Sequence, residues 1–164
     1  MNVKILFRLI AGVAFLWTIT EAIAESPATP DEAVKIGLSR LHGKPFTLGW
    51  VDSSGAVADQ TFITLSATKP SRQAKDFAKR ISEGDAKEVV FVVAGPNSAK
   101  AKCVVAGALK LLKKKLPKLT LCFIGDPEHE AEVALLVAAV GGQVPPSSPE
   151  KKPPQTTGAF GPRV

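Results

Sequence analysis

The chain has 164 residues, of which 45% are hydrophobic, 22% charged and 6% aromatic, and its formal net charge is +6. With 13 glycines and 13 prolines, this composition excludes collagen, a coiled coil and a wholly disordered chain, and is typical of one compact domain with unstructured ends. The two cysteines, Cys103 and Cys122, fit no CxxC or zinc-ligand spacing and are too few for a disulfide-built miniprotein. The fold therefore depends on an apolar core.

The first 24 residues have the pattern of a secretory signal peptide. Lys4 and Arg8 form the positive start, an apolar run follows, and Ala22-Ile23-Ala24 supplies small residues at the cleavage positions. The alternative is a retained membrane anchor, but the apolar run is much shorter than the roughly 20 residues that a spanning helix needs. We expect cleavage after Ala24 and a secreted or periplasmic mature chain that does not span a membrane.

Residues 30–82 carry sequence patterns of helices and strands. The capping box Thr29-Pro30-Asp31-Glu32 predicts a helix from Pro30 to about His42. Aromatic and β-branched residues at 46–51 and 61–65, separated by Asp52-Ser53-Ser54-Gly55, predict a β-hairpin. Residues 71–82 have the spacing of an amphipathic helix.

The second half of the domain predicts a β-α-β-α unit. Apolar runs at 89–94 and 119–124 are typical of strands buried on both faces, and the segment between them predicts a helix from residue 99 to about 115. A last helix is expected at 128–140. Because such a unit joins strands in one sheet, the two strands should lie parallel with helix 99–115 covering one face.

These elements predict a small α/β domain at 25–144 with a three-layer-like arrangement. Its mixed sheet would combine the N-terminal hairpin with the two parallel strands. Residues 145–164 are rich in proline and lysine, with too little apolar material to pack, and predict a disordered or polyproline-like tail.

The loops after the parallel strands are the candidate ligand site, because open α/β sheets hold ligands at that edge. Asn97 and Ser98 would bind an anion, and Asp126 with His129 would act as a base and its orienting group. The alternative is that these residues only cap helices, which accounts for each residue type. The acids and histidine around 126–130 make a poor metal site, since neighbours on a helix point to different sides. No cofactor motif occurs.

A second candidate is a basic surface made by Lys110, Lys113, Lys114 and Lys118. It would bind an anionic polymer or lipid, whereas nucleic acid is not expected as a partner because no aromatic positions are interleaved with the lysines. The alternative is that these lysines only complement the dipole at a helix end.

Two further features give expectations. Cys103 should point away from the sheet and Cys122 into the core, so the two thiols should be unpaired. Helix 128–140 is apolar on all sides, which favours a homodimer or an envelope protein as the partner that covers it.

A secretion signal without a complete set of catalytic residues predicts an exported, non-catalytic accessory or binding module of the cell envelope. The rival is a small hydrolase or anion-binding enzyme that uses the strand-end loops.

Overall fold

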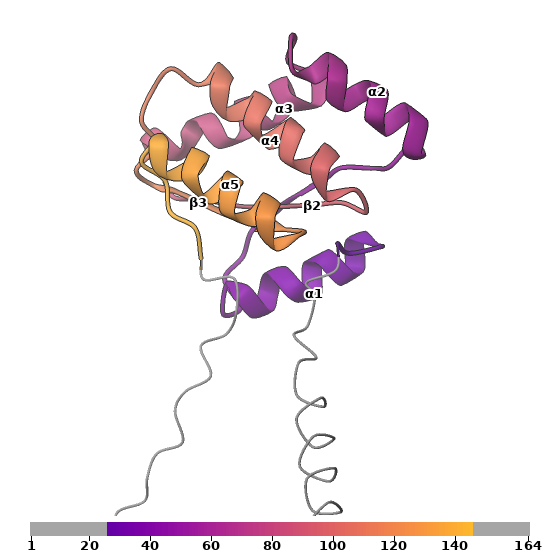
Figure 1. Ribbon diagram of the computed structural model, residues 1–164. Coiled ribbons are helices and arrows are strands. Elements are labelled where there is room, and N and C mark those ends of the chain that lie inside the picture. Colours follow the sequence, from indigo (N-terminus) through magenta and orange to yellow (C-terminus); the bar gives the residue numbers. More distant parts are fainter. Residues whose placement is uncertain (1–25, 146–164) are drawn as a thin grey trace, which may run out of the picture.

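The computed structural model describes residues 26–145. The predicted signal peptide and residues 146–164 of the predicted tail lie outside the described residues. Between them the chain forms a small α/β domain with a three-stranded sheet in the order β1-β2-β3 (Figure 1). Both pairings are parallel, so β1 (Thr47–Trp50) and β3 (Leu119–Ile124) are the edges and β2 (Val89–Ala94) is the centre.

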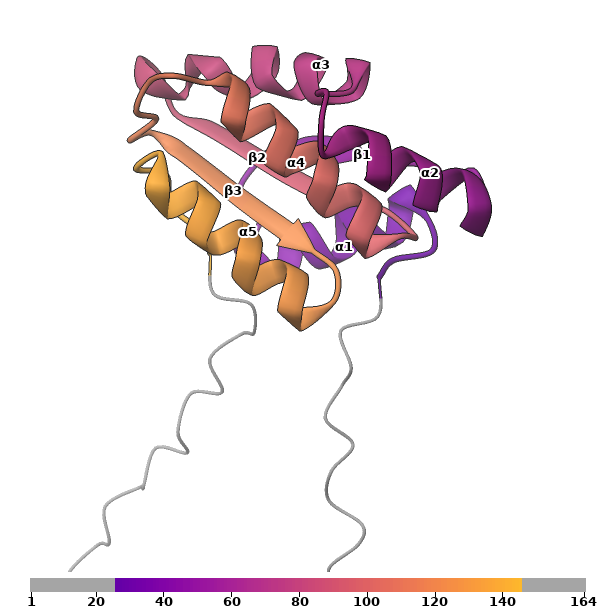
Figure 2. The same cartoon turned by 45° about the horizontal axis from the view of Figure 1, so that its top comes forward.

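Helices cover both faces of this sheet (Figure 2). On one face lies α1 (Pro30–Arg40), and on the other lie α3 (Arg72–Ile81), α4 (Ser98–Leu111) and α5 (Pro127–Ala139). The helix α2 (Ala56–Ser66) packs against α4 at the rim of that second layer, and a 3-10 turn, η1 (Ser82–Asp85), follows α3. Each face therefore has its own hydrophobic core.

The larger core is built from the apolar faces that the sequence predicted. Phe77 of α3 stands edge-on to Phe91 of β2, with ring centroids 5.2 Å apart, an arrangement that aromatic pairs prefer. Val104 and Val105 of α4 are fully buried in the same core. The predicted α3 and the parallel pairing of β2 with β3, with α4 over one face, are confirmed.

The predicted hairpin is wrong. Residues 61–65 belong to α2, and β1 pairs parallel with β2, so the sheet is wholly parallel and not mixed. The less exposed positions of α2 are Asp59, Phe62, Ile63 and Ser66, which have the spacing of one helical face. The position buried most deeply in that face is an acid, so a search for apolar periodicity does not find the helix.

The helix α4 ends at Leu111, four residues before the predicted Lys115. Continuing the helix would set Lys113 and Lys114 one turn from Lys110, where like charges repel. The chain instead leaves the helix at Leu112 and buries Leu116 before β3. None of the helices in residues 26–145 is long and apolar enough to cross a membrane.

Candidate functional site

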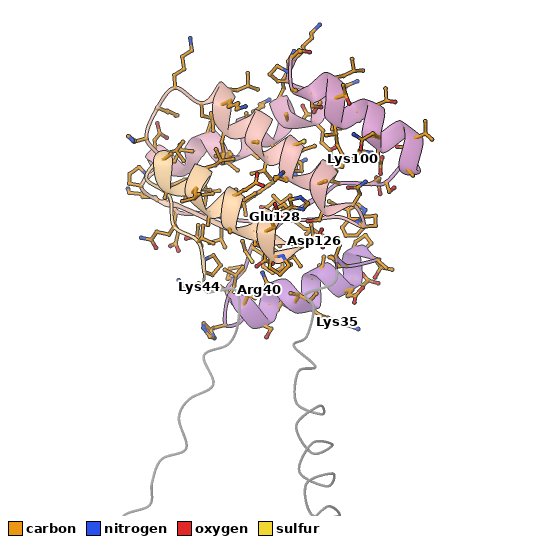
Figure 3. All side chains as sticks on the ribbon, in the orientation of Figure 1. Lys35, Arg40, Lys44, Lys100, Asp126 and Glu128 are labelled. Atoms are coloured by element: carbon orange, nitrogen blue, oxygen red, sulfur yellow. The ribbon has the colours of Figure 1, made fainter. Side chains whose placement is uncertain are left out.

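The loops that follow the three strands meet at the carboxyl edge of the sheet. Residues 51–55 lead into α2, 95–97 into α4, and 125–126 into α5. Polar side chains from these loops and helices form two adjacent groups that together we call the strand-end cluster: Ser53, Ser54, Asp59, Asn97 and Lys100 in one, and Ser98, Asp126 and His129 in the other. Lys100 and Asp126 are labelled in Figure 3.

The centre of the strand-end cluster is an ion pair that the sequence did not reveal. Lys100 Nζ donates to Asp59 Oδ1 at 2.7 Å, and these two residues are only 6% and 1% exposed. The Lys100 ammonium also donates to the carbonyl of Asp52 and lies 5.2 Å from the centre of the Phe62 ring. The pair therefore ties α4 to α2 and to the loop after β1.

Both oxygens of the Asp59 carboxylate accept hydrogen bonds from neighbouring residues in addition to Lys100. Ser53 Oγ donates to Oδ2 at 2.6 Å, the Ser54 N–H donates to Oδ1 at 2.9 Å, and Asn97 Nδ2 donates to Oδ2 at 3.1 Å. Burial would raise the pKa of Asp59, but these bonds and that from Lys100 outweigh it and hold the pKa well below its ordinary value. Asp59 is therefore ionised at neutral pH.

Asn97 joins the loop after β2 to this ion pair. Its side-chain oxygen accepts the N–H of Lys100 and so caps α4, while its amide nitrogen donates to Asp59. The cap is the role that the sequence predicted as the alternative to ligand binding. One side chain thus fixes both the start of α4 and the position of the buried carboxylate.

Ser98, Asp126 and His129 form the other part of the strand-end cluster. Ser98 Oγ lies 2.8 Å from His129 Nδ1 and accepts the Asp126 N–H at 2.9 Å. Asp126 occupies the N-cap position of α5, but its carboxylate makes no capping bond and lies 3.4 Å from His129 Nδ1. The structure therefore brings together all four residues of the predicted ligand site.

This arrangement differs from a hydrolytic triad. In a triad the serine and the carboxylate contact opposite nitrogens of the imidazole, so that the ring takes the serine proton while the acid orients it. Here both contact Nδ1, and Ser98 is only 4% exposed. The ring links the starts of α4 and α5, and the serine hydroxyl has little access to a substrate.

A solvent-open depression of about 610 Å³ lies over the strand-end cluster. It is lined by Ser26, which precedes α1, and by residues of α2, of the strand-end loops and of the start of α4: Ser53, Ala56, Asp59, Pro96, Asn97, Ser98, Ala99 and Asp126. Its only charged lining residues are Asp59 and Asp126. The enzyme hypothesis requires this depression to hold an anion. Because both charged lining residues are acids, they disfavour anion binding there.

The predicted acidic start of α5 also serves other contacts. Glu130 Oε1 accepts from Arg40 Nη1 at 2.7 Å and from the Gly125 N–H, while Glu132 accepts from Lys102. Glu130 and Glu132 therefore each bind a different neighbouring element, and the two carboxylates do not share a site. Among the described residues, no group of three or more histidine, cysteine or acidic side chains is placed to bind a metal.

The predicted basic residues lie at the opposite, amino edge of the sheet. Lys110 is in the last turn of α4, whereas Lys113, Lys114 and Lys118 follow in the loop before β3. Lys114 pairs with Asp85, and Lys118 Nζ donates to the Ala86 carbonyl at 2.6 Å. Lys110 and Lys113 are exposed and form no ion pair within the described residues.

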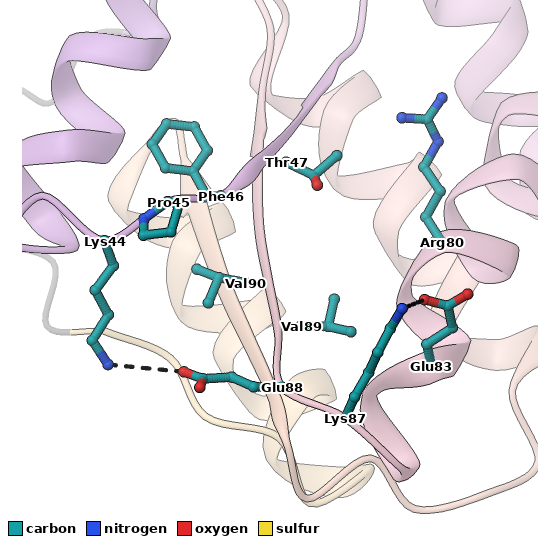
Figure 4. Close-up of a pocket in the computed structure, with 10 residues that line it drawn as sticks. All are labelled: Lys44, Pro45, Phe46, Thr47, Arg80, Glu83, Lys87, Glu88, Val89 and Val90. Atoms are coloured by element: carbon teal, nitrogen blue, oxygen red, sulfur yellow. Dashed lines mark ion pairs between the residues drawn. The ribbon is translucent and has the colours of Figure 1, made fainter.

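A larger depression of about 670 Å³ opens at the same edge (Figure 4). Its floor is apolar, with Phe46, Val89 and Val90, and its rim is charged. Two rim lysines are paired with acids, Lys87 with Glu83 at 2.6 Å and Lys44 with Glu88 at 3.9 Å. The third rim cation, Arg80, forms no ion pair within the described residues.

The expectation for the two thiols is confirmed, since neither cysteine forms a disulfide. Cys122 is 1% exposed in the core under α1, whereas Cys103 of α4 is half-buried and belongs to neither core. Burial raises the pKa of both thiols, which lowers the reactive thiolate fraction.

A thiol-labelling experiment tests this placement. In the native protein we expect a maleimide to modify Cys103 slowly and to leave Cys122 untouched until the chain unfolds. The rates are measured by intact mass. An unlabelled mass two hydrogens lighter than the sequence would reveal a disulfide and contradict the geometry.

Helix α5 is less exposed than its composition suggests. Val133 and Val137 are fully buried, and Leu136 and Val140 pack against the same core. Leu135, 73% exposed, is the only large apolar side chain of α5 that is largely in solvent. A partner on this helix stays a prediction, resting on one leucine among small and acidic residues.

Comparison of the whole chain with protein-family models, with curated proteins and with solved structures finds no match. What the protein does is therefore inferred from its own residues.

Proposed function

We propose that the protein is an exported, non-catalytic binding module of the cell envelope whose ligand is an anionic polymer. The export rests on the signal pattern of residues 1–24. The choice of ligand rests on one observation: unpaired cationic side chains gather at the amino edge of the sheet. The reactive groups of the carboxyl edge, by contrast, are engaged with one another.

The cations at the amino edge come from two neighbouring helices. Because α3 and α4 each precede a strand that starts at this edge, and because they pack side by side, their last turns lie together. Lys79 and Arg80 lie in the last turn of α3, Lys110 lies in the last turn of α4, and Lys113 follows that helix. All four are exposed, and none forms an ion pair within the described residues.

Such lysines also stabilise a helix end through its dipole, at about 0.3–1 kcal/mol each. The dipole accounts for Lys79, Arg80 and Lys110, which lie in last turns. It accounts less well for Lys113, which lies beyond the helix in a segment with Lys114 and Lys115. A run of like charges in a loop costs self-repulsion, and an anionic ligand relieves it.

Charge reversal tests this proposal with polyphosphate as the probe. We expect the double variant Lys110→Glu/Lys113→Glu to bind polyphosphate roughly tenfold more weakly, since each lysine removed from a polyanion contact weakens the electrostatic term. The matched control is Lys35→Glu/Lys69→Glu, which changes the net charge equally on other surfaces. Affinity is measured by fluorescence anisotropy at low and physiological salt.

Equal losses in the double variant and its control would show that only net charge matters, and would remove the specific site. Wild-type affinity that stays constant as salt rises would exclude an electrostatic ligand site altogether, because exposed charges are screened within about 10 Å at 0.1 M salt.

The second candidate, a small hydrolase or anion-binding enzyme, rests on the contact between Ser98 and His129. If Asp126 and His129 act as proton carriers, alanine at both positions abolishes turnover or ligand binding and leaves the melting temperature unchanged. If they only link α4 to α5, the same variant melts earlier and loses nothing else. Binding of small anions is followed by thermal shift, since a ligand stabilises the fold as its excess over Kd grows.

A further inference from the structure

One edge of the sheet is closed and the other is open. At the β3 edge, Gln143 exchanges two backbone hydrogen bonds with Leu119 and Leu121. Further along, Arg40 Nη1 donates to the Phe123 carbonyl. Side chains and chain segments thus protect β3, as edge strands generally require.

The β1 edge has no such cover. The Val51 N–H donates to the Ala94 carbonyl of β2, and backbone groups alternate along a strand. The backbone groups of Phe46, Leu48 and Trp50 therefore face away from the sheet. Among the described residues, the only group that forms a hydrogen bond with these outward backbone atoms is Gln73 Nε2, which donates to the Trp50 carbonyl at 2.8 Å.

An apolar strip runs beside this open edge. The side chains of Phe46, Leu48 and Trp50 all point to the face that α1 covers, where they are only half-buried. The reason is that α1 packs over β2 and β3 and leaves β1 largely bare. An open backbone edge and three large apolar side chains therefore adjoin each other.

We propose that β1 pairs antiparallel with β1 of a second copy of this chain, about a two-fold axis at Leu48. Leu48 then faces its own copy, and their outward N–H and C=O groups form two hydrogen bonds, as in a hydrogen-bonded antiparallel pair. In the same register Phe46 faces Trp50 of the second copy. The two apolar strips become one, with aromatic pairs on both sides of the axis.

Charge complementarity selects this occupant and this register. Lys44 faces Asp52 of the second copy, and the symmetry repeats the pair at the other end. Both residues are exposed at the ends of the strip, where Lys44 lies 3.9 Å from Glu88 and Asp52 accepts from Trp50 Nε1 at 2.7 Å. Each contact leaves its charged group open on the solvent side, so opposite charges lie at the two ends of an apolar centre. A shift of the register by two residues loses both ion pairs. The segment 44–52 is therefore complementary to itself, which a two-fold interface requires.

Cysteine crosslinking tests the axis directly, with the native Cys103 replaced by serine. Facing residues of a hydrogen-bonded pair have Cα atoms about 5.5 Å apart, which a disulfide spans. Leu48→Cys is expected to give a covalent dimer under mild oxidation. The matched control Thr47→Cys stays monomeric, because Thr47 faces Gly49 of the second copy and its own copy lies diagonally, beyond reach of a disulfide.

A charge-swap series tests the register at the two ends of the apolar strip, where Asp52→Lys also removes the acceptor of the Trp50 Nε1 hydrogen bond. Lys44→Asp and Asp52→Lys each place like charges opposite one another, and each is expected to weaken the dimer about fivefold or more. The double variant Lys44→Asp/Asp52→Lys restores wild-type affinity, and the control Lys35→Asp leaves it unchanged. Dissociation constants come from sedimentation equilibrium, and circular dichroism verifies folding.

Rescue by the double variant and selective crosslinking at residue 48 would establish the pairing. A wild-type chain that stays monomeric at the highest concentrations, equal crosslinking at 47 and 48, or a double variant as weak as the single variants would overturn it. None of these outcomes depends on polyphosphate binding.

Discussion

Replacing Asp59 by alanine is expected to lower the free energy of unfolding by about 3–5 kcal/mol, because it leaves the Lys100 ammonium buried without its counter-charge. Lys100→Met should have a comparable effect by stranding the carboxylate. In the double variant Asp59→Ala/Lys100→Met neither charge remains, so the loss should be well below the sum of the two. Urea denaturation measures all three.

The control for this cycle is Lys102→Met on the same helix. Lys102 pairs with Glu132 in a more exposed setting, where an ion pair contributes about 1 kcal/mol or less. A loss from Asp59→Ala no larger than that of Lys102→Met would show that the buried pair does not hold the loops together.

The same carboxylate makes the fold sensitive to acid. Because the folded pKa of Asp59 lies well below its unfolded value, its contribution to stability is complete above about pH 4 and disappears as pH falls toward the folded pKa. We expect Asp59→Asn to be less stable than wild type at neutral pH and to lose less additional stability on acidification. Parallel acid-stability curves would contradict the lowered pKa.

Gly95→Ala is expected to destabilise the domain by about 3 kcal/mol or more. A Cβ atom at this position would overlap the carbonyl oxygen of Val51, which is backbone and cannot rotate away. The loops after β1 and β2 would have to separate, and the strand-end cluster would open with them. The variant is compared with wild type by thermal and urea denaturation.

The neighbouring substitution Pro96→Ala is the control for Gly95→Ala. It changes the same loop at an exposed side chain and should cost no more than about 1 kcal/mol. If the two variants are equally stable, the close approach of the two loops is not a constraint on the fold.

Elements dominated by apolar contacts could be predicted from the sequence. Residues 89–94 and 119–124 are nearly pure apolar runs, and they form the central strand β2 and its neighbour β3. The structure also places four candidate site residues, Asn97, Ser98, Asp126 and His129, at one edge of the sheet, while their role in binding a ligand stays a prediction. The reason for this placement is topological, since parallel strands bring the loops after them to one edge.

The ion pair Asp59–Lys100 could not be predicted from composition or spacing. The two residues are far apart in the chain, and a charged side chain is by default assigned to solvent. The same default concealed α2, whose buried face begins at that acid. A signal was present in Asp52-Ser53-Ser54-Gly55, because Asp, Ser and Gly are favoured just before a helix as well as in a turn.

A titration of isotope-labelled protein with polyphosphate, followed by amide chemical shifts, tests most directly where the ligand binds. The account predicts that the shifts concentrate at the amino edge, around Arg80, Lys110 and Lys113. Shifts confined to Asn97, Ser98 and the start of α5 would contradict it and move the function to the carboxyl edge.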